Sequence, residues 1–320
     1  MIEIEGLTKR FGPITAVAGI DLRVGKGEVL GFLGPNGAGK STTMKIVAGY
    51  LAADEGRVRV CGHDIETDPI AAQREIGYLP EGAPAYSDMT PRQFLLFVAR
   101  ARGYVGEVAN SLVAAAVAKT ELDPVLDQSI ETLSKGFKRR VGVAQAILHD
   151  PPVLIMDEPT DGLDPNQKHS VRTLIRAMAA TKAIVISTHL LEEVEAVCTR
   201  AVIIDKGRVV ADGTPAQMLA RSRHHNAVTL VLPVAQADGA KAKLKAMPAV
   251  ANIEQGRPED NRVPITLFPK SGALLIEDVS AMAIAERWDV KELYAEAGRL
   301  DEVFRAITTP DPTRARESRA

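Results

Sequence analysis

The sequence predicts an α/β protein in which a main domain is followed by a small α+β domain. A glycine-rich loop at residues 34–41 lies between a buried-strand pattern and a helix pattern, and strands and helices alternate again through residues 153–213. Beyond residue 225 the predicted order is β-α-β-β-α-β. We therefore expect an open, largely parallel sheet in the first domain and a ferredoxin-like sheet in the second.

Composition fits a soluble globular protein. The 320 residues are 46% hydrophobic and 25% charged, so the chain can bury a substantial core. With a formal net charge of −2, the chain has no overall positive potential that would attract nucleic acid. Cys61 and Cys198 follow no motif spacing, which indicates two reduced thiols in a reducing compartment.

The apolar segments are too short for a membrane span. The acidic, alternating N-terminus is not a secretory signal. The richest apolar stretches, at 94–99 and 111–118, fall well short of the ~18 residues that a spanning helix needs. We expect a cytoplasmic protein that meets a membrane only through a partner.

Strand patterns dominate the first eighty residues, and helix patterns follow. Residues 1–11 alternate as a half-buried strand does, and Gly25 and Gly27 separate two further strand-like runs. More strands are expected at 56–62 and 74–80. The predicted helices occupy residues 89–103, 108–122 and 135–150. The later elements of the first domain are strands at 153–157 and 183–188, each followed by a helix, and a hairpin at 201–213 that turns at Lys206–Gly207.

A linker or short helix at 214–225 leads into the second domain. Its predicted strands lie at 227–233, 250–255, 263–269 and 288–296, and its predicted helices at 235–247, 272–287 and 299–307. Residues 309–320 are polar and contain proline, so we expect disorder there.

The loop Gly34-Pro35-Asn36-Gly37-Ala38-Gly39-Lys40-Ser41 matches G-x-x-x-x-G-K-[ST], with a strand before it and a helix after it. Its glycines let backbone N–H groups converge on phosphate oxygens, and the helix beginning near Gly39 directs its positive end at the same place. Lys40 can reach the β- and γ-phosphates, and the Ser41 hydroxyl can ligate Mg²⁺. We predict a nucleotide site here.

Two carboxylates end the buried run Val153–Met156. Asp157 and Glu158 would lie at the carboxyl end of a parallel strand, where ligands of open α/β sheets gather. Asp157 is expected to hold Mg²⁺, and Glu158 to polarise the water that attacks the γ-phosphate. This pair indicates hydrolysis. A GTPase is excluded because the base-specific N-K-x-D sequence is missing.

The segment Leu133-Ser134-Lys135-Gly136-Phe137 predicts a second anion site. Ser134 can cap the following helix, whose exposed start carries a glycine. One chain cannot easily close this site onto its own phosphate loop. A head-to-tail homodimer could, with each ATP held between one chain's loop and the other chain's Ser134–Gly136.

These motifs, in this order, resemble those of ABC transporter ATP-binding subunits, and the resemblance covers about residues 1–215. Within the family, the group of ABC-2 type exporters and gliding-motility ATPases is the most similar. GPNGAGKS resembles the Walker A loop, LSKGF the signature, and VLIMDE the Walker B strand. The resemblance implies a P-loop NTPase fold with an antiparallel β subdomain and a helical subdomain at about 82–150. It also implies ATP and Mg²⁺ as cofactors.

The resemblance assigns roles to further residues. Glu158 and His189, the switch histidine, would be catalytic, and Asp164 of the D-loop would shape the dimer contact. Glu81 would join Ser41 and Asp157 around Mg²⁺. The residues implied to bind ATP are Phe11, which would stack on adenine, Gly34, Pro35, Asn36, Gly37, Ala38, Gly39, Lys40, Ser41 and Thr42.

Two positions depart from the family pattern. Glu81 stands where the family usually has glutamine, and it adds negative charge near the triphosphate. Lys135 and Phe137 replace a glycine and a glutamine of the signature. Lys135 could add a cation near the partner's γ-phosphate or lie in solvent.

The predicted function is ATP-driven transport, in the direction of export, through a separate permease. Residues 82–97 would receive the coupling helix of that permease, and the chain would sit at the inner face of the membrane. The alternative is a soluble ABC-type ATPase in translation or DNA maintenance. The expected domains are 1–215 for nucleotide binding, 216–225 as linker and 226–308 as an accessory domain that is regulatory, dimer-stabilising or simply stabilising. Neither the cargo nor the permease can be identified from the sequence.

Overall fold

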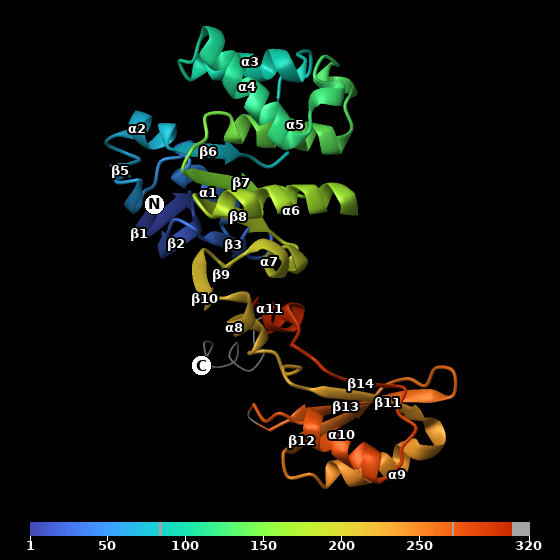
Figure 1. Cartoon of the computed structure of the whole chain (residues 1–320). Helices are drawn as coiled ribbons and strands as arrows, with labels where there is room; N and C mark the ends of the chain where they lie inside the picture. The colour runs from blue at the N-terminus through green and yellow to red at the C-terminus, as the bar shows by residue number, and fades with distance from the viewer. Residues whose placement is uncertain (83–84, 271, 309–320) are drawn as a thin grey trace. The chain divides into compact units, whose positions relative to one another are not determined.

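The computed structural model describes residues 1–82, 85–270 and 272–308. The chain divides into two compact units, Met1–Pro215 and Ala216–Ala320 (Figure 1). The predicted tail at 309–320 and two residues of the predicted coupling segment, 83 and 84, lie outside the described residues.

An antiparallel sheet opens the first unit, with strand order β2-β1-β4-β5. Ile2, Ile4 and Leu7 are buried on one face of β1, which explains its alternating sequence. The strands are β1 (Ile2–Phe11), β2 (Ile14–Val24), β4 (Glu55–Val60) and β5 (His63–Asp64).

The larger sheet of this unit has strand order β10-β9-β3-β8-β7-β6. All neighbours are parallel except β9 and β10, which form the predicted hairpin. At its turn Lys206 and Gly207 both have positive φ, 48° and 76°, as a tight hairpin turn requires. The strands are β3 (Val29–Leu33), β6 (Ile76–Leu79), β7 (Val153–Asp157), β8 (Ala183–Thr188), β9 (Arg200–Asp205) and β10 (Arg208–Gly213).

One hydrophobic core joins the two sheets. Every residue of β3, β7 and β8 is buried, so these strands read as continuous apolar runs rather than alternating ones. Helix α1 (Lys40–Val47) contributes Met44 and Ile46 to the core, which also takes Phe32 from β3 and Ile4 from β1. This packing fixes the start of α1 at the carboxyl end of β3.

Three helices form the subdomain next to β6 (Figure 1). They are α3 (Pro91–Ala101), α4 (Gly106–Thr120) and α5 (Lys135–Ile147), with short 3-10 turns at Asp123–Val125 and Ile130–Thr132. Helix α4 begins and ends two residues before the predicted bounds. It ends at Thr120 because Glu121 adopts the left-handed conformation (φ 52°) that terminates a helix.

The predictions missed one helix. Helix α2 (Pro69–Arg74) begins with proline and is only six residues long, so it carries little periodicity. The predicted strand at 74–80 was therefore too long, since Arg74 ends α2 and β6 begins at Ile76. The remaining helices of the unit are α6 (Pro165–Ala179) and α7 (Leu191–Val197).

The second unit contains a four-stranded antiparallel sheet with order β12-β13-β11-β14. Its elements follow the β-α-β-β-α-β order expected from the sequence, and its core contains Leu230, Leu244, Ile265 and Val279. The elements are β11 (Val228–Pro233), α9 (Val234–Lys245), β12 (Val250–Gln255), β13 (Arg262–Pro269), α10 (Ile276–Ala285) and β14 (Glu292–Ala295).

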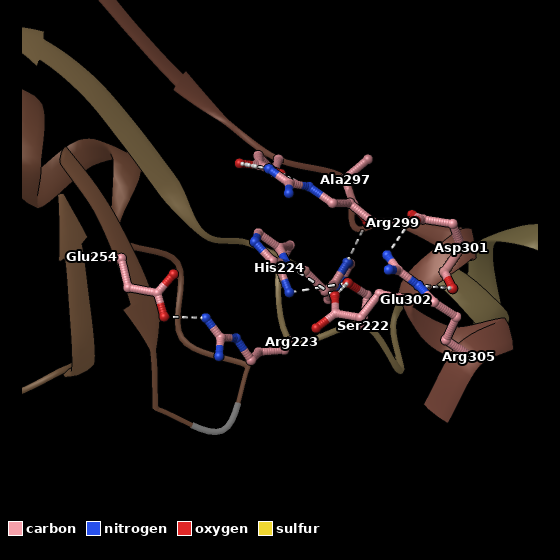
Figure 2. Close-up of polar contacts among 11 residues, drawn as sticks. Ser222, Arg223, His224, Glu254, Ala297, Arg299, Asp301, Glu302 and Arg305 are labelled. Carbon is pink, nitrogen blue, oxygen red and sulfur yellow. Dashed lines mark hydrogen bonds and ion pairs between the residues drawn. The ribbon is translucent and has the colours of Figure 1, made fainter. Parts of the chain in front are cut away.

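Two short helices flank this sheet in sequence, α8 (Pro215–Leu219) and α11 (Leu300–Thr308). Figure 2 shows that Glu302 of α11 binds the segment that follows α8. The Glu302 carboxylate accepts a hydrogen bond from Ser222 Oγ (2.6 Å) and lies 2.9 Å from His224 Nδ1. The His224 ring in turn lies edge-on against Phe268 of β13. The last helix is thus tied to the domain through polar contacts.

Within the described part of the chain, every helix is too short or too polar to cross a lipid bilayer.

Candidate active site

A cleft of about 430 Å³ opens over the phosphate loop. Residues from the loop, from β1 and β2, and from the carboxyl ends of β6 and β7 meet there because of the strand order. The lining residues are Phe11, Ala16, Asn36, Gly37, Gly39, Lys40, Ser41, Thr42, Glu81, Asp157 and Glu158. Of the residues predicted to bind ATP, Gly34, Pro35 and Ala38 are not in this lining.

The loop is shaped for close approach of an anion. Gly39 has φ 105°, and a Cβ placed there would lie 2.3 Å from the carbonyl oxygen of Ala16, so a side chain is excluded. Helix α1 begins directly after it, which directs free N–H groups into the cleft. Lys40 Nζ donates to the carbonyl oxygens of Gly34 (2.7 Å) and Pro35 (3.2 Å), which holds the amine across the loop.

Phe11 is not a core residue. Its side chain is 48% exposed at the end of β1 and lines the cleft, and Lys9 Nζ lies 5.6 Å from its ring centroid. An exposed aromatic face beside a phosphate loop is available for stacking on a base.

The buried carboxylate of Asp157 has one oxygen that could bind a cation. Its side chain is 2% exposed, and its Oδ1 accepts a hydrogen bond from Ser187 Oγ of β8. Its Oδ2 is buried without a hydrogen-bond partner among the described residues. An acceptor left open in this way fits a metal ligand. No group of three or more metal-ligating side chains occurs in the described ranges.

Glu158 and His189 are in direct contact. His189 Nδ1 lies 3.0 and 2.9 Å from the two carboxylate oxygens of Glu158. Glu158 has φ 51°, a conformation that few non-glycine residues adopt and that often occurs at functional sites. Burial raises the pKa of Glu158, and the contact with His189 partly opposes this increase. A carboxylate with a raised pKa is a stronger base, as the predicted role requires.

Carboxylates outnumber cations around the cleft. Burial lowers the pKa of Lys40, whereas the charges of Glu158, Asp157 and Glu81 act in the opposite direction. Glu81 is exposed and lines the cleft with the other two carboxylates. The structure thus brings all three predicted acidic residues to the end of the loop.

The signature residues lie outside this cleft. Ser134 caps α5 by accepting a hydrogen bond from the backbone N–H of Phe137 (3.3 Å), as predicted. Ser134 and Lys135 are exposed, and neither they nor Gly136 line the cleft of their own chain. The exposed helix start is therefore available to a second molecule.

Asp164 has a clear local role. Its Oδ1 accepts hydrogen bonds from the backbone N–H groups of Asn166 (2.9 Å) and Gln167 (3.0 Å), which caps α6. It thereby fixes the end of the segment 161–164. Its predicted part in a dimer contact stays a prediction.

Gly136 allows a close approach between α5 and α6. A Cβ at this position would lie 2.2 Å from Oε1 of Gln167. We expect Gly136→Ala to slow ATP hydrolysis about tenfold, because the methyl group collides with Gln167 and displaces the start of α5, where the predicted second anion site lies. The measurement is steady-state ATPase of the complete chain. The double variant Gly136→Ala with Gln167→Ala relieves the collision and should recover most of the activity. Hydrolysis by Gly136→Ala at the unchanged rate would contradict the prediction.

The sequence did not reveal two contributors to the site. Ala16 of β2 lines the cleft, and Ser187 of β8 holds Asp157. Both residues are distant in sequence from the other site residues that they meet, and strand pairing brings them together. The small polar residue at the end of the predicted strand 183–188 was the one available signal for Ser187.

Comparison with known proteins gives the family. Residues 17–161 match the family model described as "ABC transporter". The chain is 32% identical over 308 residues to the daunorubicin/doxorubicin resistance ATP-binding protein of Streptomyces peucetius, covering 96% of this chain and 92% of the relative. The chain belongs to the ABC transporter ATP-binding proteins.

Two further matches support this membership. The Nod factor export ATP-binding protein I of Paraburkholderia xenovorans (strain LB400) is 38% identical over 220 residues, which are 68% of this chain and 72% of the relative. A solved structure, "Structure of ATP binding subunit of ABC transporter", is 30% identical, with a TM-score of 0.63, and covers 68% of this chain and 91% of the other. This ABC protein is an ATP-binding subunit and an ATPase.

Proposed function

We propose that this ABC ATPase drives export through a separate membrane permease. Two copies bind ATP between them, closing as ATP binds and opening after hydrolysis. The observation that carries the proposal is the separation of the two anion sites. The phosphate loop lines the cleft, whereas the exposed signature helix start of the same chain does not. A second copy would complete each site.

Within each site the residues would have separate roles in binding and hydrolysing ATP. Phe11 would stack on adenine, Lys40 would bind the phosphates, and Ser41, Asp157 and Glu81 would hold Mg²⁺, which supplies charge neutralisation at the triphosphate. Glu158 would orient and deprotonate the attacking water. His189 would move from Glu158 to the γ-phosphate when nucleotide binds.

The permease would bind near the helical subdomain. A cavity of about 930 Å³ is lined by Tyr50, by Phe97 of α3 and by His149 after α5. Tyr86 and Phe97 are exposed and lie edge to face with ring centroids 5.4 Å apart. Exposed aromatic side chains beside a cavity of this size suit an amphipathic partner helix. This surface overlaps the predicted coupling segment 82–97.

The direction of transport is proposed from the relatives. Their names refer to Nod factor export and to daunorubicin/doxorubicin resistance. Since these names refer to different cargoes, they do not assign a cargo to this chain. We also propose the domain limits 1–215, 216–225 and 226–308, and a position at the inner face of the membrane through the permease.

Co-expression with a candidate membrane permease tests the function. We expect the two to purify together in detergent, and we expect ATPase activity to rise at least about threefold when the correct cargo is added to the reconstituted complex. Recovery of the complete chain with ribosomes or DNA, and no binding to the permease, would instead favour the soluble ATPase alternative.

A further inference from the structure

A ladder of polar contacts joins helices α6 and α7, which pack against each other (Figure 1). Three cationic side chains at four-residue intervals lie on one face of α6 and meet acceptors on α7. The cations are Lys168, Arg172 and Arg176, and the acceptors are Glu192, Glu193 and the carbonyl oxygen of Ala196. We call these six residues the α6–α7 ladder.

Arg172 and Glu193 form the centre of the ladder. Arg172 Nε donates to both carboxylate oxygens of Glu193, at 3.1 Å each, and Arg172 Nη2 donates to Oε1 of the same carboxylate. The hydrogen bond to Glu193 raises the pKa of Arg172. Arg172 Nη2 also donates to Glu192 (3.2 Å), which accepts a further hydrogen bond from Lys168 Nζ (3.2 Å). The guanidinium is therefore held in one orientation by two carboxylates.

The burial of Glu193, which is only 2% exposed, needs a specific explanation. Burying a carboxylate is costly, and a buried ion pair often gives no more stability than apolar side chains of similar volume. Helix α7 already has an apolar face, since Val194 and Val197 are buried. Apolar contacts are non-directional, whereas a forked arginine–carboxylate contact has a defined geometry. The ladder therefore fixes the register of α7 against α6.

Each of the two helices begins directly after a loop of the active site. The segment 161–164 leads into α6, and His189 lies just before α7. Helix α7 has only seven residues, so its position depends on the contacts that it makes. Glu158 meets both loops, because its carboxylate contacts His189 and its carbonyl oxygen accepts a hydrogen bond from the backbone N–H of Asp161 (3.1 Å). The contacts thus form a ring from Glu158 through α6, the ladder and α7 back to Glu158.

We propose that Arg172 and Glu193 are positioning residues, which hold His189 beside Glu158 by fixing α7 against α6. Neither residue of the pair lines the cleft, so both act through the helix that follows His189. The inference rests on the proposed role of His189 at the γ-phosphate. Because the phosphate loop is not part of the ring, loss of the pair affects the hydrolysis step and leaves nucleotide binding intact.

Variants of Arg172 in the complete chain test the proposal through kcat and KM for MgATP. Arg172→Met removes the forked contact with little change in length. We expect it to lower kcat about tenfold, because a displaced His189 no longer meets the γ-phosphate in the required geometry, and to leave KM within about twofold. Arg172→Lys keeps the charge and can still reach the carboxylate, so its kcat should fall by less than about threefold.

Arg200→Met is the matched control. Arg200 makes a forked contact with Asp212 at the amino-terminal end of β9, away from the cleft. This variant should lower the melting temperature without nucleotide and leave kcat within about twofold, because surface stability alone does not move His189. An equal loss of kcat in Arg172→Met and Arg200→Met would show a merely structural role and would overturn the inference. An unchanged kcat or a raised KM in Arg172→Met would overturn it as well.

A His189→Ala chain tests whether the pair acts through His189. In this background Arg172→Met should slow single-turnover hydrolysis by less than about twofold further, because the residue that it positions is gone. A further tenfold loss, on the order of that in the unchanged chain, would refute the inference. If the His189→Ala chain is too slow to measure, the kcat comparison alone decides.

Two further outcomes are distinguishable. If Arg172→Met does not fold, the double variant Arg172→Met with Glu193→Gln decides, because it leaves no unpaired buried charge. A lowered kcat at unchanged KM in this double variant supports the proposal, and an unchanged kcat refutes it. Hydrolysis by His189→Ala at the unchanged rate would contradict the proposed role of His189 itself, whereas a slow His189→Ala chain beside an unchanged Arg172→Met chain would refute the inference alone.

Discussion

A Glu158→Gln chain binds ATP and accumulates as a dimer, but it hydrolyses ATP at least about a hundredfold more slowly than the unchanged chain. Glutamine keeps the size of the side chain but cannot take a proton from water. The structure supports the role of Glu158 as a base, since the side chain lines the cleft and burial raises its pKa. Because ATP is then not consumed, the closed dimer persists.

Size-exclusion chromatography with MgATP, combined with single-turnover hydrolysis, measures both effects. The matched control is Glu195→Gln, which removes a carboxylate from an exposed position on α7. This control should hydrolyse normally and stay monomeric under the same conditions. If Glu158→Gln turned ATP over at the unchanged rate, another group would have to activate the water.

A Lys40→Met chain should bind ATP about tenfold to a hundredfold more weakly. Methionine preserves the length of the side chain and removes a charge-assisted contact, which is worth about 1.5–3 kcal/mol. In the structure the amine already spans the loop through the carbonyl oxygens of Gly34 and Pro35. Its loss therefore removes both the cation and part of the loop's support.

Equilibrium binding of a fluorescent ATP analogue provides the measurement. Lys45 lies on the same helix but is exposed, so Lys45→Met changes the net charge equally without entering the cleft. Equal affinities of Lys40→Met and Lys45→Met would show that the predicted phosphate contact is wrong. A melting curve without nucleotide separates weakened binding from a destabilised loop.

Local sequence predicted the features that depend on neighbouring residues. The phosphate loop follows from glycine spacing and from the flanking strand and helix, and α1 begins at Lys40, next to the predicted start. Ser134 caps α5 as expected, and the hairpin of β9 and β10 turns at Lys206–Gly207 as predicted. Each feature is determined within a few residues, where chain stereochemistry leaves few alternatives.

Long-range contacts could not be predicted in the same way. The place of Ala16 in the cleft and the hydrogen bond from Ser187 to Asp157 depend on which strands become neighbours. Arg139 is buried on the face of α5 that also carries Gly136, whereas its neighbours Lys138 and Arg140, which have the same charge, are partly exposed. Charge alone does not distinguish these three residues, whereas helix periodicity does once one contact of α5 is known.

The exposed start of α5 has a kinetic consequence. A chain does not bring Ser134–Gly136 to its own cleft. If a second copy completes the site, as proposed, turnover at low protein concentration is second order in the chain. A permease that carries two copies makes their encounter intramolecular and raises the effective concentration to about the millimolar range. Assembly on the membrane would then determine where in the cell ATP is consumed.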